Sequence, residues 1–168
     1  VGDFILPTEL NLDGYHLKFG DNFSYKRLLL VSNRLHWKFM GVLHEYIICT
    51  NENYGCKFEN IEGNYHLISG KSGARSNNPN KYRDDAIILE QAYHEAQENK
   101  DEIMVRYSFY CAQSYKDAGI PEKSIEWYKK RINHGGWNQE VFYSYITIGQ
   151  LYAQMNNMER SEEHTSEL

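Results

Sequence analysis

The chain has 168 residues, a length that fits one domain or two small ones. Hydrophobic residues make up 41% and aromatic residues 14% of it, which excludes an intrinsically disordered chain. The net charge of −5 and the pI of about 5.8 exclude a basic nucleic-acid-binding surface, so we expect no nucleic-acid partner.

The cysteines and the hydropathy indicate the cellular compartment in which we expect the protein. Cys49, Cys56 and Cys111 are odd in number and form no CxxC pair, so neither a disulfide framework nor a zinc ribbon is indicated. Reduced thiols of this kind predict a cytoplasmic protein. No stretch approaches 18 consecutive apolar residues, so we expect no membrane span.

The first half of the chain predicts a β-structure. Short apolar runs separated by Gly, Asn and Asp are typical of antiparallel strands, which need a further layer to pack on. The runs lie at 14–20, 25–31, 36–40, 44–50, 57–61 and 64–69. The segment 69–80, "SGKSGARSNNPN", has the composition of a mobile loop.

From residue 81 the apolar period changes to that of helices. We expect four helices, at 81–98, about 102–118, 121–134 and 139–156. Gly119 and Gly135 are expected to end the second and third helices, and Pro121 to begin the third. Strands followed by helices predict an α+β chain, with a sheet half at 1–80 and a helical half at 81–159.

The helical half contains an internal repeat. Ala112, Tyr115 and Gly119 recur as Gly149, Tyr152 and Asn156, with an offset of 37 residues at each position. Ser124 and Tyr128 supply the small and aromatic residues of the helix between them. The pattern resembles that of tetratricopeptide repeats (TPR), in which small residues let helices approach and aromatic residues fill the adjoining space.

The pair His44–Glu45 ends an apolar stretch, "HWKFMGVLHEY", and is the first candidate for chemistry. A zinc-protease HExxH motif would need a histidine at 48, where Ile48 stands. One interpretation is a hydrogen-bonded structural pair. The other is a general base, Glu45, whose pKa is raised by partial burial at a strand end, behind a glycine (Gly41) that permits close approach.

Three further residue sets have a structural and a functional interpretation. Lys71 and Arg75 lie on the Gly/Ser loop and either bind a phosphate or belong to a solvated linker; the Walker spacing fails because Tyr65 occupies the first glycine position. His66 is either a metal ligand or a structural histidine. Trp37 either packs in the core or stacks on a sugar or base.

Three segments together resemble a group of family-2 glycosyltransferases in which a GT-A nucleotide-sugar domain precedes TPR-like helices. They are "YKRLLLVSNRLHWKFMGVLHEY" (25–46), "SGKSGARSNNPNKYRDDAIILEQA" (69–92) and "RYSFYCAQSYKDAGIPEKSIEWYKKRINHGGWNQEVFYS" (106–144). The resemblance implies that residues 1–80 are the C-terminal portion of a GT-A catalytic domain, composed of mostly antiparallel strands, and that 81–159 are TPR-like hairpins.

The resemblance also implies roles for the candidate residues. Glu45 would accept the proton of the acceptor hydroxyl, with His44 assisting. Trp37, Gly41, Lys71 and Arg75 would contact substrate. His66 would reach the Mn²⁺ or Mg²⁺ ion that assists departure of the nucleotide diphosphate, in an inverting transfer.

The chain departs from the family at the donor side. No Asp-x-Asp motif occurs in it, so we expect the donor-binding half to belong to the full-length parent and the fragment alone to be inactive. The resemblance implies an acceptor that is a glycan, a lipid or a protein. The last nine residues, 160–168, resemble a translated sequencing-library adapter and are expected to be a non-native tail.

The alternative function is a non-enzymatic interaction module. In that case the helices bind a protein partner, or form a dimer, through a groove lined by aromatic residues, and the sheet half is scaffold. The simpler interpretation of those aromatic residues is packing within the repeat.

Overall fold

The computed structural model describes residues 1–20, 24–51, 53–70 and 77–166, with side chains as far as residue 156. The chain is α+β, as predicted, and forms two compact units. Val1–Gly41 and Glu45–Gly73 form one, called here the sheet unit. Val42–His44 and Ala74–Leu168 form the other, the helical unit.

The strands of the sheet unit form two small sheets. They are β1 (Gly14–Phe19), β2 (Tyr25–Val31), β3 (Trp37–Met40), β4 (Tyr46–Cys49) and β5 (Phe58–Asn60). One sheet has the order β2-β1-β5, and β3 and β4 form an antiparallel hairpin. β1 pairs antiparallel with β2 through a register shift between Tyr15 and His16.

Two expectations for these strands are wrong. β5 pairs parallel to β1 rather than antiparallel, because the chain runs through β2, β3 and β4 before it returns, a crossover long enough for parallel pairing. The run 64–69 makes only isolated bridges, Gly2 with Tyr65 and Phe19 with Leu67. Apolar alternation predicts extended chain, but it does not specify the strand partner.

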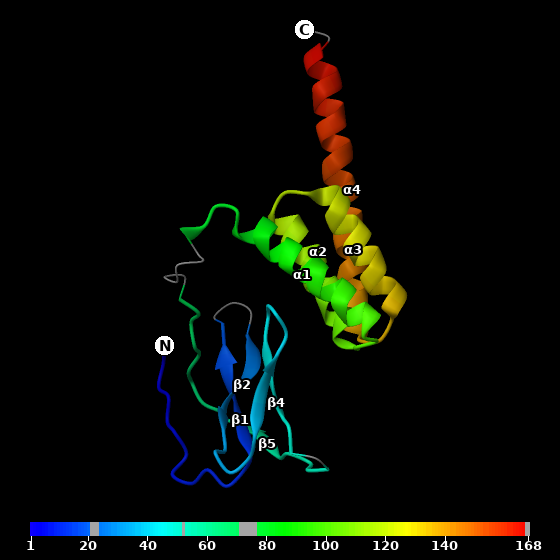
Figure 1. The fold of residues 1–168 in the computed structure, drawn as a ribbon. Coiled ribbons are helices and arrows are strands. Elements are labelled where there is room, and N and C mark those ends of the chain that lie inside the picture. The colour runs from blue at the N-terminus through cyan, green and yellow to red at the C-terminus, as the bar shows by residue number, and fades with distance from the viewer. Residues whose placement is uncertain (21–23, 52, 71–76, 167–168) are drawn as a thin grey trace. The chain divides into compact units, whose positions relative to one another are not determined.

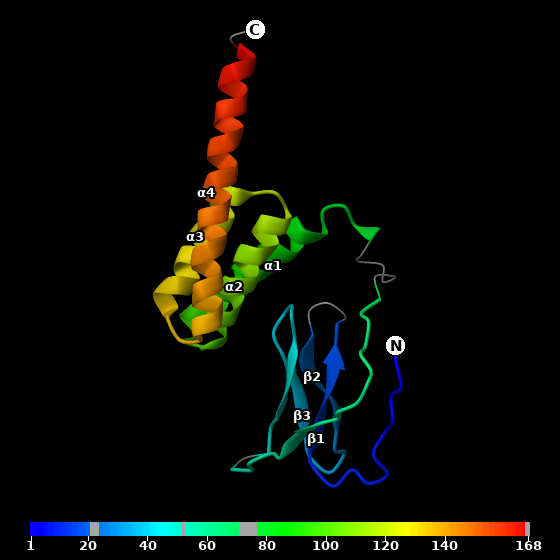
Figure 2. The same ribbon diagram turned by 180° about the vertical axis from the view of Figure 1, so that it is seen from behind.

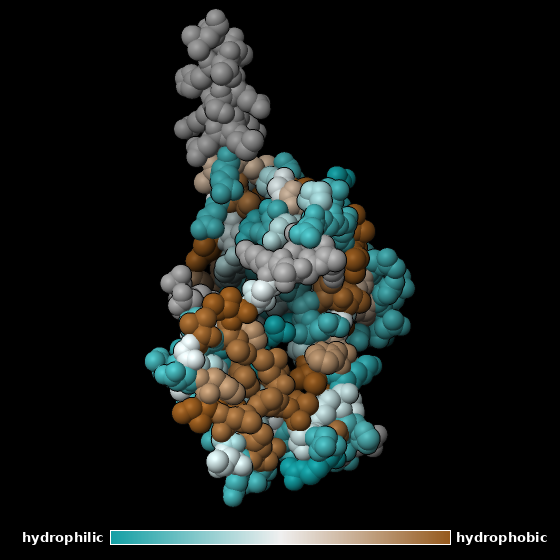
Figure 3. Space-filling model, turned by 90° about the vertical axis from the view of Figure 1, so that its left-hand side faces the viewer, coloured by the Kyte–Doolittle hydropathy of each residue, from teal (hydrophilic) through white to brown (hydrophobic). Residues whose placement is uncertain are grey.

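The core of the sheet unit is small. Its buried apolar side chains are Tyr15, Leu17, Ile61 and Tyr65. The Tyr65 hydroxyl donates to the Ile61 carbonyl at 2.6 Å, which satisfies a polar group inside this core. Many apolar side chains of the unit remain exposed, including Ile5, Leu6, Leu10, Leu29 and Phe39. Figure 3 shows apolar surface gathered on one face of the unit.

The helical unit contains the larger core. Its helices are α1 (Lys81–Glu98), α2 (Ile103–Asp117), α3 (Pro121–His134) and α4 (Asn138–Ser166), which pack side by side in Figures 1 and 2. The buried cluster includes Leu89, Cys111, Ala112, Trp127 and Tyr128, none more than 1% exposed.

The helix ends agree with the sequence pattern except at α4. Pro121 begins α3, and Gly119 and Gly135 adopt φ values of 72° and 64° beyond α2 and α3. We expected the fourth helix to end at 156, but it continues to Ser166. No glycine or proline lies between Asn156 and Ser166, so no residue there interrupts the helix.

A buried ion pair connects α3 to α4. Arg131 is 1% exposed, and its Nε donates to Oε2 of Glu140 at 2.8 Å. A second guanidinium nitrogen donates to the Gly135 carbonyl at 2.5 Å, so the same side chain also holds the α3–α4 loop. Removing either charge would leave the other buried without a counter-charge.

Glu140→Ala is expected to lower the free energy of unfolding by about 3–5 kcal/mol, since it leaves the Arg131 charge buried alone. The matched control is Glu126→Ala, which removes an exposed pair with Lys130 and should cost less than about 0.5 kcal/mol. Urea denaturation followed by circular dichroism measures both. Equal losses in the two variants would contradict the assignment.

His134 lies at the end of α3, where its Nε2 is 3.0 Å from the Tyr93 hydroxyl. Burial lowers the pKa of His134 below the ordinary 6.5, and the nearby Arg131 charge lowers it further. The fold therefore favours the neutral ring. Its contribution to stability is present above pH 6.5 and is lost as the pH falls through the lower folded pKa.

The expected consequence is a pH-dependent difference between the wild type and His134→Gln. The wild type should lose more stability than the variant between pH 7.5 and the acidic side of its folded pKa, because only the wild type must protonate a ring that the fold holds neutral. Urea midpoints at the two pH values, with an NMR titration of the imidazole, measure this. Parallel losses in both proteins would refute it.

Candidate functional site

The turn between β3 and β4 holds Glu45 and His44. The last pair of the hairpin is Met40 with Tyr46, so residues 41–45 form the connection and Glu45 immediately precedes β4. Gly41 has φ of 104° and His44 has φ of 53°, both in the region that a non-glycine side chain rarely adopts. Glycine makes the turn possible at 41, and His44 accepts the conformation only with support from its neighbours.

Contacts within the helical unit support His44. Its carbonyl accepts a hydrogen bond of 2.7 Å from the Arg106 guanidinium, and its ring stacks on Tyr110 with centroids 3.9 Å apart. Leu43 packs against the helical core beside it. Both backbone and ring of His44 are therefore anchored, which favours a positioning role over direct acid–base work.

Glu45 belongs to the sheet unit and its side chain is exposed. The expected partial burial is not seen, because the residue lies in the turn before β4 rather than inside a strand. It does not line the cavity around Asp13 that is described below. The carboxylate is open to solvent, where an incoming hydroxyl could reach it.

Trp37 makes contacts within the sheet unit that are typical of a packing residue. Its indole N–H donates to the Ser32 carbonyl at 2.8 Å, and the centroids of its ring and the Phe58 ring lie 6.3 Å apart. It is half-buried. The hydrogen bond fixes the indole against the preceding loop, which agrees with the packing interpretation, while the exposed part of the ring stays available to a ligand.

Of the remaining candidates, only His66 is among the described residues. Lys71 and Arg75 lie outside the described residues. His66 is half-buried, and its backbone exchanges hydrogen bonds with Val1. Within the described part of the chain, no three His, Cys, Asp or Glu side chains converge as a metal site would require.

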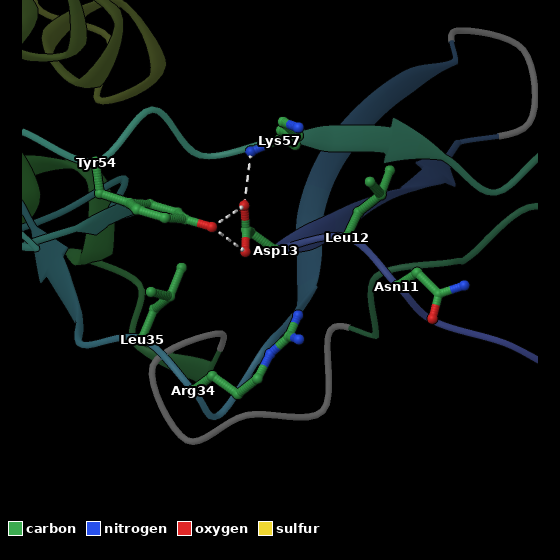
Figure 4. Close-up of a pocket in the computed structure, with 7 residues that line it drawn as sticks. All are labelled: Asn11, Leu12, Asp13, Arg34, Leu35, Tyr54 and Lys57. Atoms are coloured by element: carbon green, nitrogen blue, oxygen red, sulfur yellow. Dashed lines mark hydrogen bonds between the residues drawn. The ribbon is translucent and has the colours of Figure 1, made fainter.

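A cavity of about 360 Å³ surrounds Asp13, a residue that the sequence analysis did not select. Asp13 is 5% exposed, and its carboxylate accepts hydrogen bonds from the Tyr54 hydroxyl at 3.2 and 3.3 Å and from the Lys57 backbone N–H at 2.9 Å. Figure 4 shows both donors directed at this carboxylate. The cavity is lined by Asn11, Leu12, Asp13, Arg34, Leu35, Tyr54 and Lys57.

The hydrogen bonds make Asp13 an anchor rather than a base. It joins the start of β1 to the loop before β5, in which Asn53 has φ of 57°. Hydrogen bonding to Asp13 raises the pKa of the Tyr54 phenol, because the neutral hydroxyl is the donor. In the sequence, Asp13–Gly14 is typical of a turn, and that signal does not reveal burial.

The same loop contains a thiol, Cys56. Burial raises the pKa of Cys56 to about 11, and its neighbour Cys49 raises it as well. Both cysteines are free and half-buried, while Cys111 is fully buried in the helical unit. A raised thiol pKa means little thiolate near neutral pH, which argues against a nucleophilic role for Cys56.

Asp13→Ala is expected to destabilise the loop before β5 by about 1–3 kcal/mol, because the Lys57 N–H loses its acceptor. Asp13→Asn keeps one acceptor oxygen and should lose less. Amide hydrogen exchange of Lys57, together with urea denaturation, measures the difference. Unchanged Lys57 exchange in Asp13→Ala would show that the carboxylate does not hold the loop.

Comparison of the chain with models of known protein families, with curated proteins and with solved structures finds no match. No described helix is long and apolar enough to cross a membrane.

Proposed function

We propose that the chain is the acceptor-side part of a glycosyltransferase, which transfers a sugar from a nucleotide-sugar donor to an acceptor hydroxyl. The observation that carries the proposal is the exposed Glu45, held in a turn whose neighbours Gly41 and His44 have left-handed backbones. A non-glycine residue with a left-handed backbone, as His44 has, is more frequent at functional sites than elsewhere. The resemblance of segment 25–46 to family-2 enzymes selects the reaction class.

In this proposal Glu45 is the general base. It accepts the proton of the acceptor hydroxyl as the oxygen attacks the anomeric carbon and the nucleotide diphosphate departs. His44 is a positioning residue, since its carbonyl and ring are held by Arg106 and Tyr110. Gly41 permits the turn that presents the carboxylate.

The donor side of the reaction lies outside these residues in the proposal. A Mn²⁺ or Mg²⁺ ion would neutralise the diphosphate, but the described residues bring no suitable set of ligands together and no Asp-x-Asp occurs in the chain. Residues 1–80 are then the C-terminal portion of a GT-A domain. The sheet unit exposes apolar surface, which is what we expect if a further layer of the parent protein packs on it.

Glu45→Gln in the full-length parent should lower kcat by about 10²–10⁴-fold, the range typical of general-base removal. The matched control is Glu59→Gln, an exposed glutamate on β5 that should leave kcat unchanged. Release of nucleoside diphosphate from a panel of nucleotide sugars, with and without acceptor, is the measurement.

Two outcomes would overturn this proposal. One is full activity of Glu45→Gln in the parent. The other is turnover by the 168-residue chain alone, which would show that the donor site does not depend on a further half.

The second candidate function is an interaction module built on TPR-like helices. It is favoured by one observation: α4 exposes large aromatic side chains, Phe142 at 66% and Tyr145 at 60%. Exposed aromatic clusters are common at protein interfaces. The two functions are compatible, since a transferase can recruit a protein through its helices.

A further inference from the structure

Two cysteines lie at the ends of a short loop in the sheet unit. Cys49 is the last residue of β4, and Cys56 lies two residues before Phe58, where β5 begins. Both thiols are free and half-buried. They differ in this from Cys111, which is 0% exposed in the helical unit.

A reverse turn in the loop brings the two cysteines towards each other. The Tyr54 backbone N–H donates to the Asn51 carbonyl at 3.4 Å, which is the hydrogen bond that closes a four-residue turn. Cys49 lies two residues before this turn, and Cys56 lies two residues after it. In a regular hairpin, residues placed symmetrically about the turn have Cα atoms about 4.5–5.5 Å apart. That distance falls within the about 4.4–6.8 Å at which a disulfide forms without distortion.

Side-chain contacts on both sides of the loop support this placement. A side-chain hydrogen bond joins the thiols of Cys49 and Cys56, and the Cys49 Sγ also lies 3.6 Å from Oδ1 of Asn51. Trp37 is the register partner of Cys49 in the β3–β4 hairpin, and the centroids of its ring and the Phe58 ring lie 6.3 Å apart. The end of β4 and the start of β5 are therefore held near each other.

We propose that Cys49 and Cys56 form a reversible disulfide that fixes the loop around Asp13. The oxidant is a small disulfide, such as glutathione disulfide. One cysteine displaces a first glutathione and forms a mixed disulfide, and the other cysteine then displaces the second glutathione. Two protein S–H bonds break and one S–S bond forms, while the oxidant takes up two electrons and two protons to give two glutathione thiols. The inference is independent of sugar transfer and of the interaction module.

The environment of Cys56 favours reaction as a pair over reaction alone. Burial raises the pKa of the Cys56 thiol, and the hydrogen bond and charge of Cys49 raise it further, to about 11. Cys56 by itself is therefore a slow nucleophile near neutral pH. A Cys49 that is bonded to glutathione carries no charge, which removes one cause of the raised pKa. The neighbouring position of Cys56 then gives it a high effective concentration for the second displacement.

The loop that the disulfide would close also carries the donors that hold Asp13. The Tyr54 hydroxyl and the Lys57 backbone N–H both donate to the Asp13 carboxylate, and Cys56 lies between these donors in the chain. A covalent bond from Cys56 to the end of β4 removes loop conformations in which the donors leave Asp13. The oxidised loop should therefore open less often than the reduced loop.

Mass spectrometry of the 168-residue chain, incubated with glutathione disulfide, tests the pairing. The wild type should lose two hydrogens and regain them with dithiothreitol. Proteolytic cleavage after Glu52 separates the two cysteines, so the resulting peptides should stay joined only in the oxidised protein. Cys56→Ser should stop at the mixed disulfide of Cys49 with one glutathione.

The matched control is Cys111→Ala. Its thiol is fully buried, and burial raises its pKa, so the variant should form the internal bond as the wild type does. Amide hydrogen exchange provides the second measurement. The Lys57 amide should exchange more slowly in the oxidised than in the reduced wild type, and treatment with glutathione disulfide should not slow it in Cys56→Ser.

Three outcomes would overturn the proposal. One is a wild type that accumulates glutathione adducts without an internal bond. Another is an internal bond that includes Cys111, or a bond between two molecules in place of the internal one. The third is an internal bond that leaves Lys57 exchange unchanged, which would show that the disulfide does not fix the loop. None of these outcomes affects the Glu45 assay.

Discussion

The hydrogen bond from Ser124 to the Ala112 carbonyl is the contact on which the helical unit depends. It forms only because small side chains at both positions bring the backbones of α2 and α3 close together. Aromatic rings then fill the space on either side, and Tyr115 also donates to Glu90 of α1. Small residues set the distance between the helices, and large ones set the buried area.

The two units differ in how their side chains are used. The helical unit buries aromatic rings, the Arg131–Glu140 ion pair and several hydroxyl groups that are hydrogen-bonded, such as that of Ser144. Among its described residues, the sheet unit buries the hydrophobic side chains of Tyr15, Leu17, Ile61 and Tyr65, and it relies on Asp13 and Tyr65 to hold loops by hydrogen bonds. The candidate base Glu45 therefore belongs to the unit with the smaller core, where loops rather than strands position polar groups.

Much of the fold follows from the sequence because local signals decide it. Pro121, Gly119 and Gly135 mark helix ends through backbone geometry alone, and the change of apolar period at residue 81 separates strands from helices. The parallel pairing of β5 with β1 was missed because partner choice depends on the path of the whole chain. The α4 end was missed because nothing in residues 156–166 breaks a helix.

The site was less accessible from sequence. The partial burial expected for Glu45 was wrong, because the apolar run 44–50 does not show that β4 begins only at Tyr46. The stacking of His44 on Tyr110 joins residues 66 positions apart in a way that no local pattern shows. Asp13 was overlooked because an Asp–Gly pair indicates a turn, whereas its burial depends on Tyr54 and Lys57. Long-range hydrogen bonds define such residues.

The position of β2 at the edge of its sheet has a consequence for solubility. One side of this strand has no neighbouring strand within the described sheet, and its backbone groups can pair with another chain. Lys26 and Arg27 place charge in the first part of the strand, which opposes such pairing. Leu28, Leu29 and Leu30 provide no such protection, so this short leucine segment is where intermolecular β-aggregation would begin if the sheet opened.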